Sequence, residues 1–204
     1  MSFIKMIDQV VYPIFENIIQ HPFLQKLSAG TLDKKIFYFY LEQDYYYLLN
    51  YTKALLSLSN NANTIKDRNF WKACANSCTH EPAFEIRNII VDDDSRKTNS
   101  CISYNNFINQ HVLKNYENGV ASVFSCAYIY FRVSKKMYPN NKNNMFMTWF
   151  DTYVSAEFVN QTQEMIELFQ RQYDQSDTKS KIELLDIVKK GAQYEWHFWD
   201  DAYL

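Results

Sequence analysis

Apolar side chains recur with the period of an α-helix along most of the 204-residue chain. Near the N-terminus they fall three or four positions apart, at Phe3, Met6, Ile7, Val10, Ile14 and Ile18. This spacing predicts a helix with one buried face, and Pro13 is expected to bend it. The segments His21-Pro22-Phe23 and Ser28-Ala29-Gly30-Thr31 then interrupt the pattern.

A long helix is predicted to follow and to run to about Leu58. Thr31 is expected to cap it, because a hydroxyl accepts hydrogen bonds from free backbone N–H groups, and Asp33 places a negative charge in the first turn. Further helices are predicted over residues 65–79, 82–91, 104–116, 119–137, 145–173 and 178–203. An acidic loop at residues 92–95 and a polar loop at residues 140–144 separate some of them.

The composition supports an all-α fold. Only 3 glycines and 4 prolines occur in the chain, far below the usual ~7% and ~5%, whereas all-β folds need many such turn residues. With 47% hydrophobic and 22% charged residues the chain has the composition of a globular protein. We expect one all-helical domain over residues 1–204, with about seven or more helices and no internal repeat.

Charge and hydropathy limit the possible partners. The net charge is −2 and the basic residues form no run longer than a pair, so a nucleic-acid partner is not expected. No stretch reaches the ~18 apolar residues of a membrane span, and Lys5 and Asp8 interrupt what would be the apolar part of a signal peptide. We therefore expect no membrane partner, a cytoplasmic location and four free cysteines.

Two carboxylates are predicted to face the interior. Asp44 lies on the same helical stripe as Phe37, Tyr40, Tyr47 and Tyr51. Burying a charged group there is costly unless it is paired. Asp44 therefore either accepts hydrogen bonds from tyrosine hydroxyls, or lies at the solvent-exposed edge of the stripe, or is free to accept a hydrogen bond from a ligand. Glu195 shares its face with Val188, Gly191, Phe198 and Ala202, and burial without a cation would raise its pKa toward that of a general acid. As a structural alternative, Glu195 simply caps the core; Glu157 and Glu81 are weaker cases.

The cysteines give weaker signals. Cys126 shares an apolar face with Ser122, Val123, Tyr130 and Val133, where a lone cysteine is most often a small core residue. Cys74 and Cys78 are four residues apart and could meet a metal ion, but no second ligand pair accompanies them. No metal site is therefore predicted.

Several segments together resemble the TenA family, also called thiaminase II, over nearly the whole chain. The matching segments are His21-Pro22-Phe23, Gly30-Thr31-Leu32, Tyr40-Leu41, Gln43-Asp44-Tyr45-Tyr46-Tyr47-Leu48, Ser103-Tyr104, Cys126 with Tyr130, Asp151-Thr152-Tyr153 with Glu157-Phe158, and Glu195 with Phe198-Trp199 and Ala202-Tyr203. Each motif is weak alone, but their order and spacing are specific. The presence of Cys126 favours the cysteine-bearing branch of this family.

The resemblance implies a heme-oxygenase-like helical bundle, assembled as a homotetramer, that works without a cofactor. It implies hydrolysis of a C–N bond at the methylene carbon of an aminopyrimidine. The small-molecule substrate would be 4-amino-5-aminomethyl-2-methylpyrimidine or thiamin, and the product would be the hydroxymethylpyrimidine used in thiamin salvage.

The resemblance also implies roles for individual residues. Cys126 would add to the pyrimidine ring, and Asp44 would hold a ring nitrogen and the exocyclic amino group. Glu195 would protonate the departing group and later deprotonate water. Among the aromatic residues, Tyr104 and Tyr153 would hydrogen-bond near these groups, Tyr130 would support Cys126, and Tyr47 and Phe198 would pack on the ring.

One departure from the family pattern concerns the pocket. Ser125 precedes the cysteine and Ala127 follows it, where the family often has a proline and an aromatic residue. The preference between the two substrates therefore stays open.

Two other functions are considered. The same fold supports heme cleavage and metal-dependent oxidation, but His21 lies at a predicted helix break and no Glu-x-x-His pattern occurs on two helices. A non-enzymatic helical regulator that binds DNA would need a basic helix, which this chain lacks.

Overall fold

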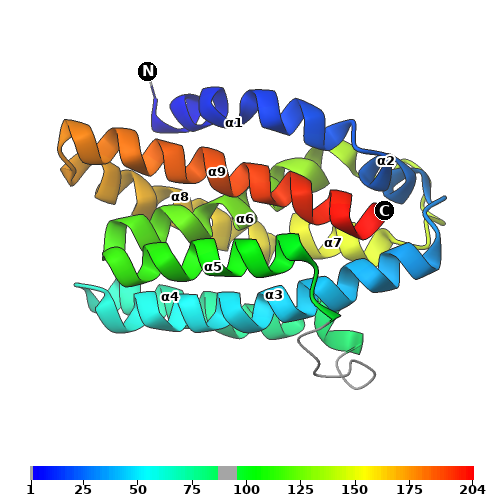
Figure 1. Cartoon of the computed structure of the whole chain (residues 1–204), viewed down its shortest axis with the longest axis horizontal. Helices are drawn as coiled ribbons and strands as arrows, with labels where there is room; N and C mark the ends of the chain where they lie inside the picture. Colours follow the sequence, from blue (N-terminus) through cyan, green and yellow to red (C-terminus); the bar gives the residue numbers. More distant parts are fainter. Residues whose placement is uncertain (1, 87–95) are drawn as a thin grey trace.

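The computed structural model describes residues 2–86 and 96–204, and within them all regular structure is helical. The elements in chain order are α1 (Phe3–Ile19), α2 (Pro22–Ala29), α3 (Lys34–Asn61), α4 (Ile65–Ser77), η1 (Cys78–His80), η2 (Pro82–Ile86), α5 (Asn99–Lys114), α6 (Tyr116–Met137), α7 (Met147–Val154), α8 (Ala156–Gln175) and α9 (Thr178–Tyr203). The long helices lie side by side as a bundle (Figure 1). The all-α prediction is therefore confirmed.

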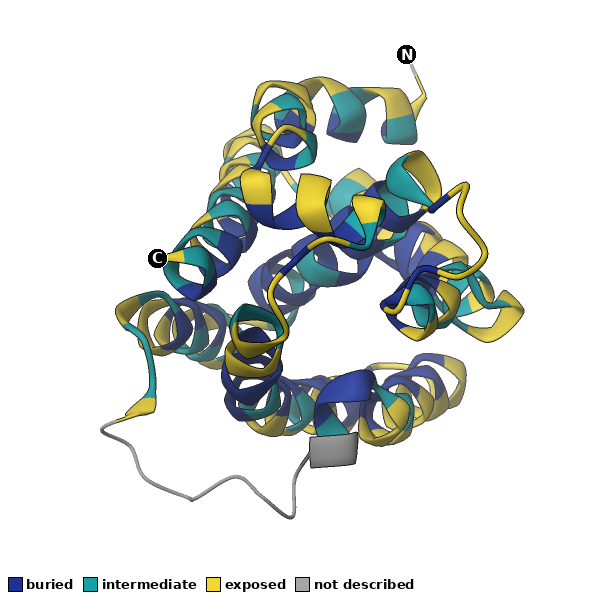
Figure 2. Ribbon diagram, turned by 90° about the vertical axis from the view of Figure 1, so that its right-hand side faces the viewer, coloured by how far each residue is buried: buried dark blue, intermediate teal, exposed yellow. Residues whose placement is uncertain are grey.

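Helix α6 lies at the centre of this bundle. It packs against α3, α5, α8 and α9, and most of its residues between Asn118 and Ser134 are buried. Figure 2 shows that the outer helices bury the side that faces the interior and expose the other side. The buried side chains of α1 and α8 are mostly apolar, as the period of their sequences predicts. Residues on α3, α6 and α9 that face the middle of the bundle therefore lie close to one another.

The chain between the first two long helices forms a short helix, α2, that the sequence pattern did not predict. His21 caps its start through a hydrogen bond from the Phe23 N–H to Nδ1, with Pro22 in the first turn. Gly30 ends it with a φ of 74°, a left-handed conformation in which glycine is favoured. The next helix then begins at Lys34, and its cap is Asp33 rather than Thr31, because the Asp33 side chain accepts from the Lys35 N–H. The prediction for Thr31 was wrong.

The predicted helix over residues 145–173 is two helices. Ser155 has an extended backbone, with a ψ of 150°, and its hydroxyl caps α8 by accepting from the Phe158 N–H. Serine competes for backbone hydrogen bonds in this way, so it favours a helix start over a helix interior. Residues 82–86 form a 3-10 helix in place of the predicted α-helix, and the rest of that segment, with the acidic loop 92–95, lies outside the described residues.

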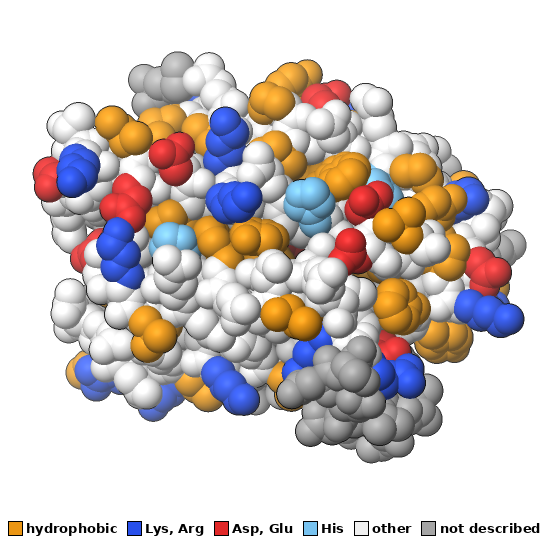
Figure 3. Space-filling model, in the orientation of Figure 1, with side chains coloured by type: hydrophobic (Ala, Val, Ile, Leu, Met, Phe, Trp, Pro, Cys, Tyr) orange, Lys and Arg blue, Asp and Glu red, His pale blue; other side chains and the backbone are white. Residues whose placement is uncertain are grey.

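The surface shows no large field of one charge on the face drawn in Figure 3, where basic and acidic side chains are interspersed. Across residues 2–86 and 96–204, no helix combines the length and the apolar character that a membrane crossing requires. All four cysteines are unpaired, as predicted.

Candidate active site

Four parts of the chain bring acids and a thiol to the middle of the bundle. Asp44 comes from α3, Cys126 from α6 and Glu195 from α9, and Glu81 follows η1 directly. Asp44, Glu81 and Cys126 line one inner cavity of about 300 Å³, together with Leu48, Tyr51, Ala127, Tyr130, Tyr153 and Phe158. Glu195 lies close enough to Cys126 that the pKa of each group depends on the other.

A close approach of α6 and α9 sets the relative position of Cys126 and Glu195. At Gly191 a Cβ atom would lie 2.4 Å from the Ser125 Oγ, so only glycine lets the two helices come this near. The Ser125 hydroxyl donates to the Val188 carbonyl at 3.0 Å and joins the same pair of helices. Cys126 follows Ser125, and Glu195 lies one helical turn beyond Gly191.

Asp44 is buried, but its carboxyl group lacks part of the hydrogen bonding that it could have. It is 4% exposed, and among the described residues Oδ2 finds no hydrogen-bond partner. Burial, followed by the charges of Glu81 and Glu195, raises its pKa well above the ordinary value. Of the three alternatives that the sequence allowed, the structure supports an acid that is free for a ligand's donor.

Glu195 is 2% exposed and accepts a 2.6 Å hydrogen bond from the Tyr104 hydroxyl at Oε1. Burial raises the pKa of Glu195 to about 8, although hydrogen bonds from Tyr104 and Cys126 favour its ionised form. An acid with this pKa changes its protonation state near neutral pH, as a general acid and base must.

Glu81 is a member of this cluster that sequence reasoning ranked too low. The Tyr153 hydroxyl donates to its Oε2 at 2.8 Å, and burial raises the pKa of Glu81 to about 7. Sequence patterns contain little sign of this role, because Glu81 stands in a short irregular segment next to Pro82, where no helical face can be assigned. Its position before a proline in a break between helices was the one available signal.

Cys126 is partly exposed, through the inner cavity that it lines. Burial raises the pKa of its thiol well above the ordinary value, and the nearby charges of Glu195 and Glu81 raise it further. The resting group is therefore a neutral thiol, so any nucleophilic role requires that its proton be moved to a neighbouring base.

Aromatic rings form the walls around these groups. The ring centroids of Tyr47 and Tyr104 lie 4.9 Å apart, and those of Tyr47 and Phe198 lie 5.7 Å apart. Tyr130 lines the inner cavity, but its hydroxyl shares a 2.9 Å hydrogen bond with Tyr40 rather than with Cys126. The structure thus brings together all eight residues that the sequence analysis assigned to the site.

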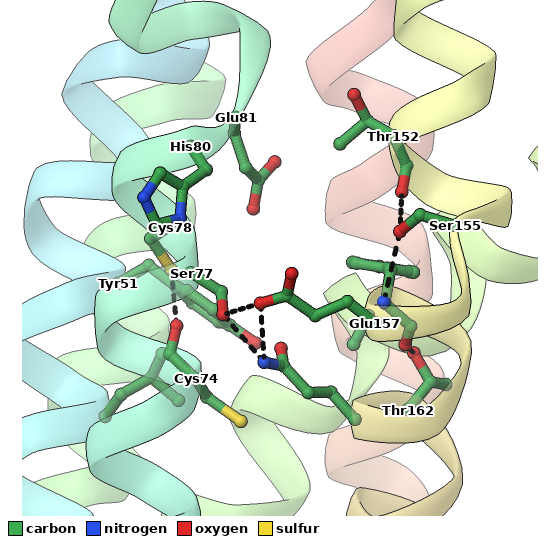
Figure 4. A pocket seen from close by; sticks show the side chains of 14 residues that line it. Tyr51, Cys74, Ser77, Cys78, His80, Glu81, Thr152, Ser155, Glu157 and Thr162 are labelled. Atoms are coloured by element: carbon green, nitrogen blue, oxygen red, sulfur yellow. Dashed lines mark hydrogen bonds between the residues drawn. The ribbon is translucent and has the colours of Figure 1, made fainter.

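A second, outer cavity adjoins the inner one. It is open to solvent, has a volume of about 780 Å³ and shares Tyr51, Glu81, Ala127 and Phe158 with the inner cavity. In Figure 4 the Glu81 carboxyl group projects into this space from one side, and Glu157 enters from α8 on the other. The wider cavity therefore gives access to the groups of the inner one.

The remaining candidates from the sequence have structural partners. Glu157 is exposed in the outer cavity and accepts a hydrogen bond from Ser77, so it does not join the inner acids. Cys78 donates to the Cys74 carbonyl, and burial raises the pKa of Cys74 to about 12. Among the described residues, no group of three or more histidines, cysteines and acids has the geometry of a metal site.

His21, the residue that could be mistaken for a heme ligand, uses both ring nitrogens elsewhere. Nδ1 accepts from the Phe23 N–H, and Nε2 lies 3.2 Å from the Asp200 carboxylate. These contacts hold α2 against α9 and leave neither nitrogen free for iron.

Comparison with known proteins agrees with this geometry. The model of the TENA/THI-4/PQQC family matches residues 9–204. The chain is 27% identical to an aminopyrimidine aminohydrolase of Helicobacter pylori over 93% of each chain, and 23% identical to one of Halalkalibacterium halodurans over 100% of this chain and 96% of the other. It also superimposes on a TenA homologue of Pyrococcus furiosus with a TM-score of 0.89 and 18% identity, over 99% of this chain and 100% of that one. The chain belongs to the TENA/THI-4/PQQC family.

Proposed function

We propose that this protein is an aminopyrimidine aminohydrolase of the thiaminase II type. It would hydrolyse the C–N bond at the methylene carbon of 4-amino-5-aminomethyl-2-methylpyrimidine, and that of thiamin, to give the hydroxymethylpyrimidine. Relatives that carry this name and align over nearly the full chain support the proposal.

The observation that carries the proposal is a site in which the described residues supply three carboxyl groups and a thiol but no lysine or arginine. Burial raises the pKa of all three acids, the charges of Glu81 and Glu195 raise that of Asp44 further, and the charge of Glu81 adds to the shift of Glu195. No lysine or arginine is among the causes of any of the three shifts. Such a site disfavours anions and favours a ligand that is basic and rich in hydrogen-bond donors. A 4-aminopyrimidine has both properties, and the aromatic walls suit its flat ring.

Asp44 holds the pyrimidine in this proposal. Its unpaired Oδ2 would accept from the exocyclic amino group, and the protonated carboxyl would donate to the adjacent ring nitrogen. The first contact supplies the hydrogen bond that Oδ2 lacks among the described residues. Tyr47 and Phe198 supply the rings beside it.

Cys126 and Glu195 carry out the covalent step. The Cys126 thiol passes its proton to the Glu195 carboxylate, and the sulfur forms a bond to a ring carbon while a ring nitrogen is protonated. The ring electrons then expel the substituent from the methylene carbon, and that carbon accepts water. Loss of a proton from the water and expulsion of the sulfur restore the aromatic ring and the free thiol. Tyr104 holds the Glu195 carboxyl in place throughout.

The proposal is tested by measuring ammonia release from 4-amino-5-aminomethyl-2-methylpyrimidine and, in parallel, thiazole release from thiamin. We expect turnover of at least one substrate without added metal or heme, and the ratio of the two kcat/KM values assigns the preferred one. Absence of both products from a folded protein would refute the proposal.

The assembly and location complete the proposal. A homotetramer, as in the family that the sequence resembles, is tested by light scattering of the purified protein, and a cytoplasmic location by fractionation of cells. The catalytic groups described above all come from one chain, so the assigned chemistry does not depend on either result.

A further inference from the structure

Glu81 occupies a different position from the other two acids. It lines both the inner and the outer cavity, whereas Asp44 lines the inner one alone. Glu81 and Cys126 are also partly exposed, while Asp44 and Glu195 are buried. Of the acids in the described site, Glu81 is therefore the one that both the substrate and the route out of the site can reach.

Glu195 is placed for another task. Its carboxyl group is bonded to Tyr104 and to the Cys126 thiol, and the Tyr104 ring stacks on Tyr194 with centroids 5.1 Å apart. It is absent from the described residues that line either cavity. This location suits proton exchange with the sulfur, not with a group that leaves toward the outer cavity.

The direction of departure follows from the two cavities. In the proposed function, Asp44 and Cys126 hold the pyrimidine ring in the inner cavity. The substituent on the methylene carbon must then leave through the space that adjoins it, past the four residues that the cavities share: Tyr51, Glu81, Ala127 and Phe158. Glu81 is the one ionisable carboxyl group among these four.

Building on the proposed function, we propose that Glu81 is the catalytic acid for the departing amine and that Glu195 serves Cys126. When the C–N bond breaks, its electron pair goes to nitrogen, so an amino group can leave as ammonia only if the nitrogen carries a third hydrogen. The Glu81 carboxyl supplies that proton, or its carboxylate holds the substrate's ammonium group in place until cleavage. Tyr153 positions Glu81 through the hydrogen bond to Oε2. This division departs from the role of Glu195 that the family resemblance implies.

The two substrates require different chemistry at this point. The thiazolium nitrogen of thiamin is quaternary, so it takes the electron pair of the C–N bond and leaves as a neutral thiazole without a proton. The aminomethylpyrimidine needs the proton. An acid that acts on the leaving group is therefore needed for one substrate and dispensable for the other, while proton transfer from Cys126 is needed for both.

The test compares Glu81→Gln with Glu195→Gln on both substrates. General acid catalysis contributes about 10²-fold to 10⁴-fold, so Glu81→Gln is expected to lower kcat/KM for ammonia release at least about 100-fold. The same variant should lower thiazole release from thiamin by less than about 10-fold. Glu195→Gln should impair both reactions to a similar extent. Glu167→Gln, the same change at an exposed position of α8, is the matched control and should alter neither.

Several outcomes would overturn this assignment. Equal losses on both substrates in Glu81→Gln would show a structural or ring-binding role, and unchanged ammonia release would exclude any role. If Glu81→Gln fails to fold, Glu81→Asp is the second variant, because it keeps an ionisable carboxyl group on a side chain shorter by one methylene. It must then lower ammonia release selectively over thiazole release. A wild-type protein that turns over neither substrate would refute the proposed function itself, and this inference with it.

Discussion

Two acids on α3 are only two residues apart in sequence, so they point to different sides of the helix, and their surroundings are opposite. The Glu42 carboxylate is bound by Arg96 through two hydrogen bonds, from Nε at 2.5 Å and from Nη2 at 2.9 Å. Asp44 has no cation among the causes of its raised pKa, and its Oδ2 has no partner among the described residues. One acid is neutralised by the protein, and the other is left to be neutralised by a proton or a ligand.

The same contrast holds across the molecule. Asp67 on α4 pairs with Arg171 at 2.6 Å, and Asp8 on α1 pairs with Arg132 on α6. These ion pairs join helices near the surface. Glu81 and Glu195 instead accept hydrogen bonds from the hydroxyls of Tyr153 and Tyr104. A carboxyl group that is buried, close to other acids and without an arginine is thus a better sign of a site than burial alone.

The largest effect is expected from removal of the nucleophile. Cys126→Ala should lower turnover of both substrates about 10⁴-fold or more, because no other thiol lines the inner cavity. The melting temperature should change little, since a small residue replaces a small one in a partly open space. Steady-state assays and thermal melts measure the two effects, and turnover close to that of the wild type would remove Cys126 from the mechanism.

Replacing each of the two acids on α3 by the corresponding amide tests the contrast directly. Asp44→Asn should lower kcat/KM about 10² to 10³-fold, because the amide cannot transfer a proton to the ring nitrogen, yet it should leave stability nearly unchanged. Burial raises the pKa of the wild-type carboxyl and so favours its neutral form, which the uncharged amide resembles in size and shape.

Glu42→Gln is the matched variant and should behave in the opposite way. It should keep activity within a few-fold but cost about 1 kcal/mol of unfolding free energy, because Arg96 loses its carboxylate while remaining half exposed. Denaturant titrations measure the unfolding free energy of each variant, and steady-state assays measure its kcat/KM. A loss of activity in Glu42→Gln that matches that of Asp44→Asn would break the contrast between the two acids.

Stability should fall as pH rises. The folded-state pKa values of Glu81 (about 7) and Glu195 (about 8) lie above the ordinary unfolded value of about 4.3. Their neutral forms therefore stabilise the fold fully below about pH 4.3, and this contribution is lost as pH rises through 7 and 8. The slope is at most about 1.4 kcal/mol per pH unit for each group.

The difference between the wild type and Glu195→Gln isolates one group. Between pH 5.5 and 8 the unfolding free energy of the variant should decline less steeply than that of the wild type. Parallel pH profiles for the two proteins would show that Glu195 is not held neutral by the fold.

A smaller effect is expected where α6 and α9 touch. In Gly191→Ala the new methyl group would overlap Ser125, whose Oγ and Cβ would lie 2.4 and 2.6 Å away. We expect a loss of about 1–3 kcal/mol in unfolding free energy and reduced activity, since the same contact places Cys126 beside Glu195. Adding Ser125→Gly to Gly191→Ala should restore part of the lost stability and part of the lost activity. An unchanged melting temperature in Gly191→Ala would contradict the close approach.

Much of the fold follows from local signals in the sequence. The apolar period predicted α1, α6 and α9 nearly to their ends, because α1 and α9 bury apolar residues at helical spacing and α6 is buried along most of its length. The break at Ser155 and the short helix after His21 were not predictable in this way. Both depend on a side chain that caps a helix from outside it, Ser155 through Oγ and His21 through Nδ1.

The site residues also divide into those that a pattern in the sequence predicts and those that depend on contacts between segments. Asp44 and Glu195 were found because an acid interrupts an apolar helical face, and Cys126 because the family resemblance singled it out. Glu81 has no such face, and its importance arises from the contact with Tyr153 and from two cavities that α3, α6, α7 and α8 line together. A period along one helix carries no information on such contacts between segments.

The most direct measurement is a calorimetric titration of the hydroxymethylpyrimidine product into Cys126→Ala, with and without Asp44→Asn. Without turnover or a covalent bond, the heat reports only recognition of the ring by the uncompensated acids. We predict saturable binding to Cys126→Ala and an affinity at least about 10-fold weaker in the double variant. Equal affinities, or no binding to folded Cys126→Ala, would contradict the assignment of this acid cluster to an aminopyrimidine.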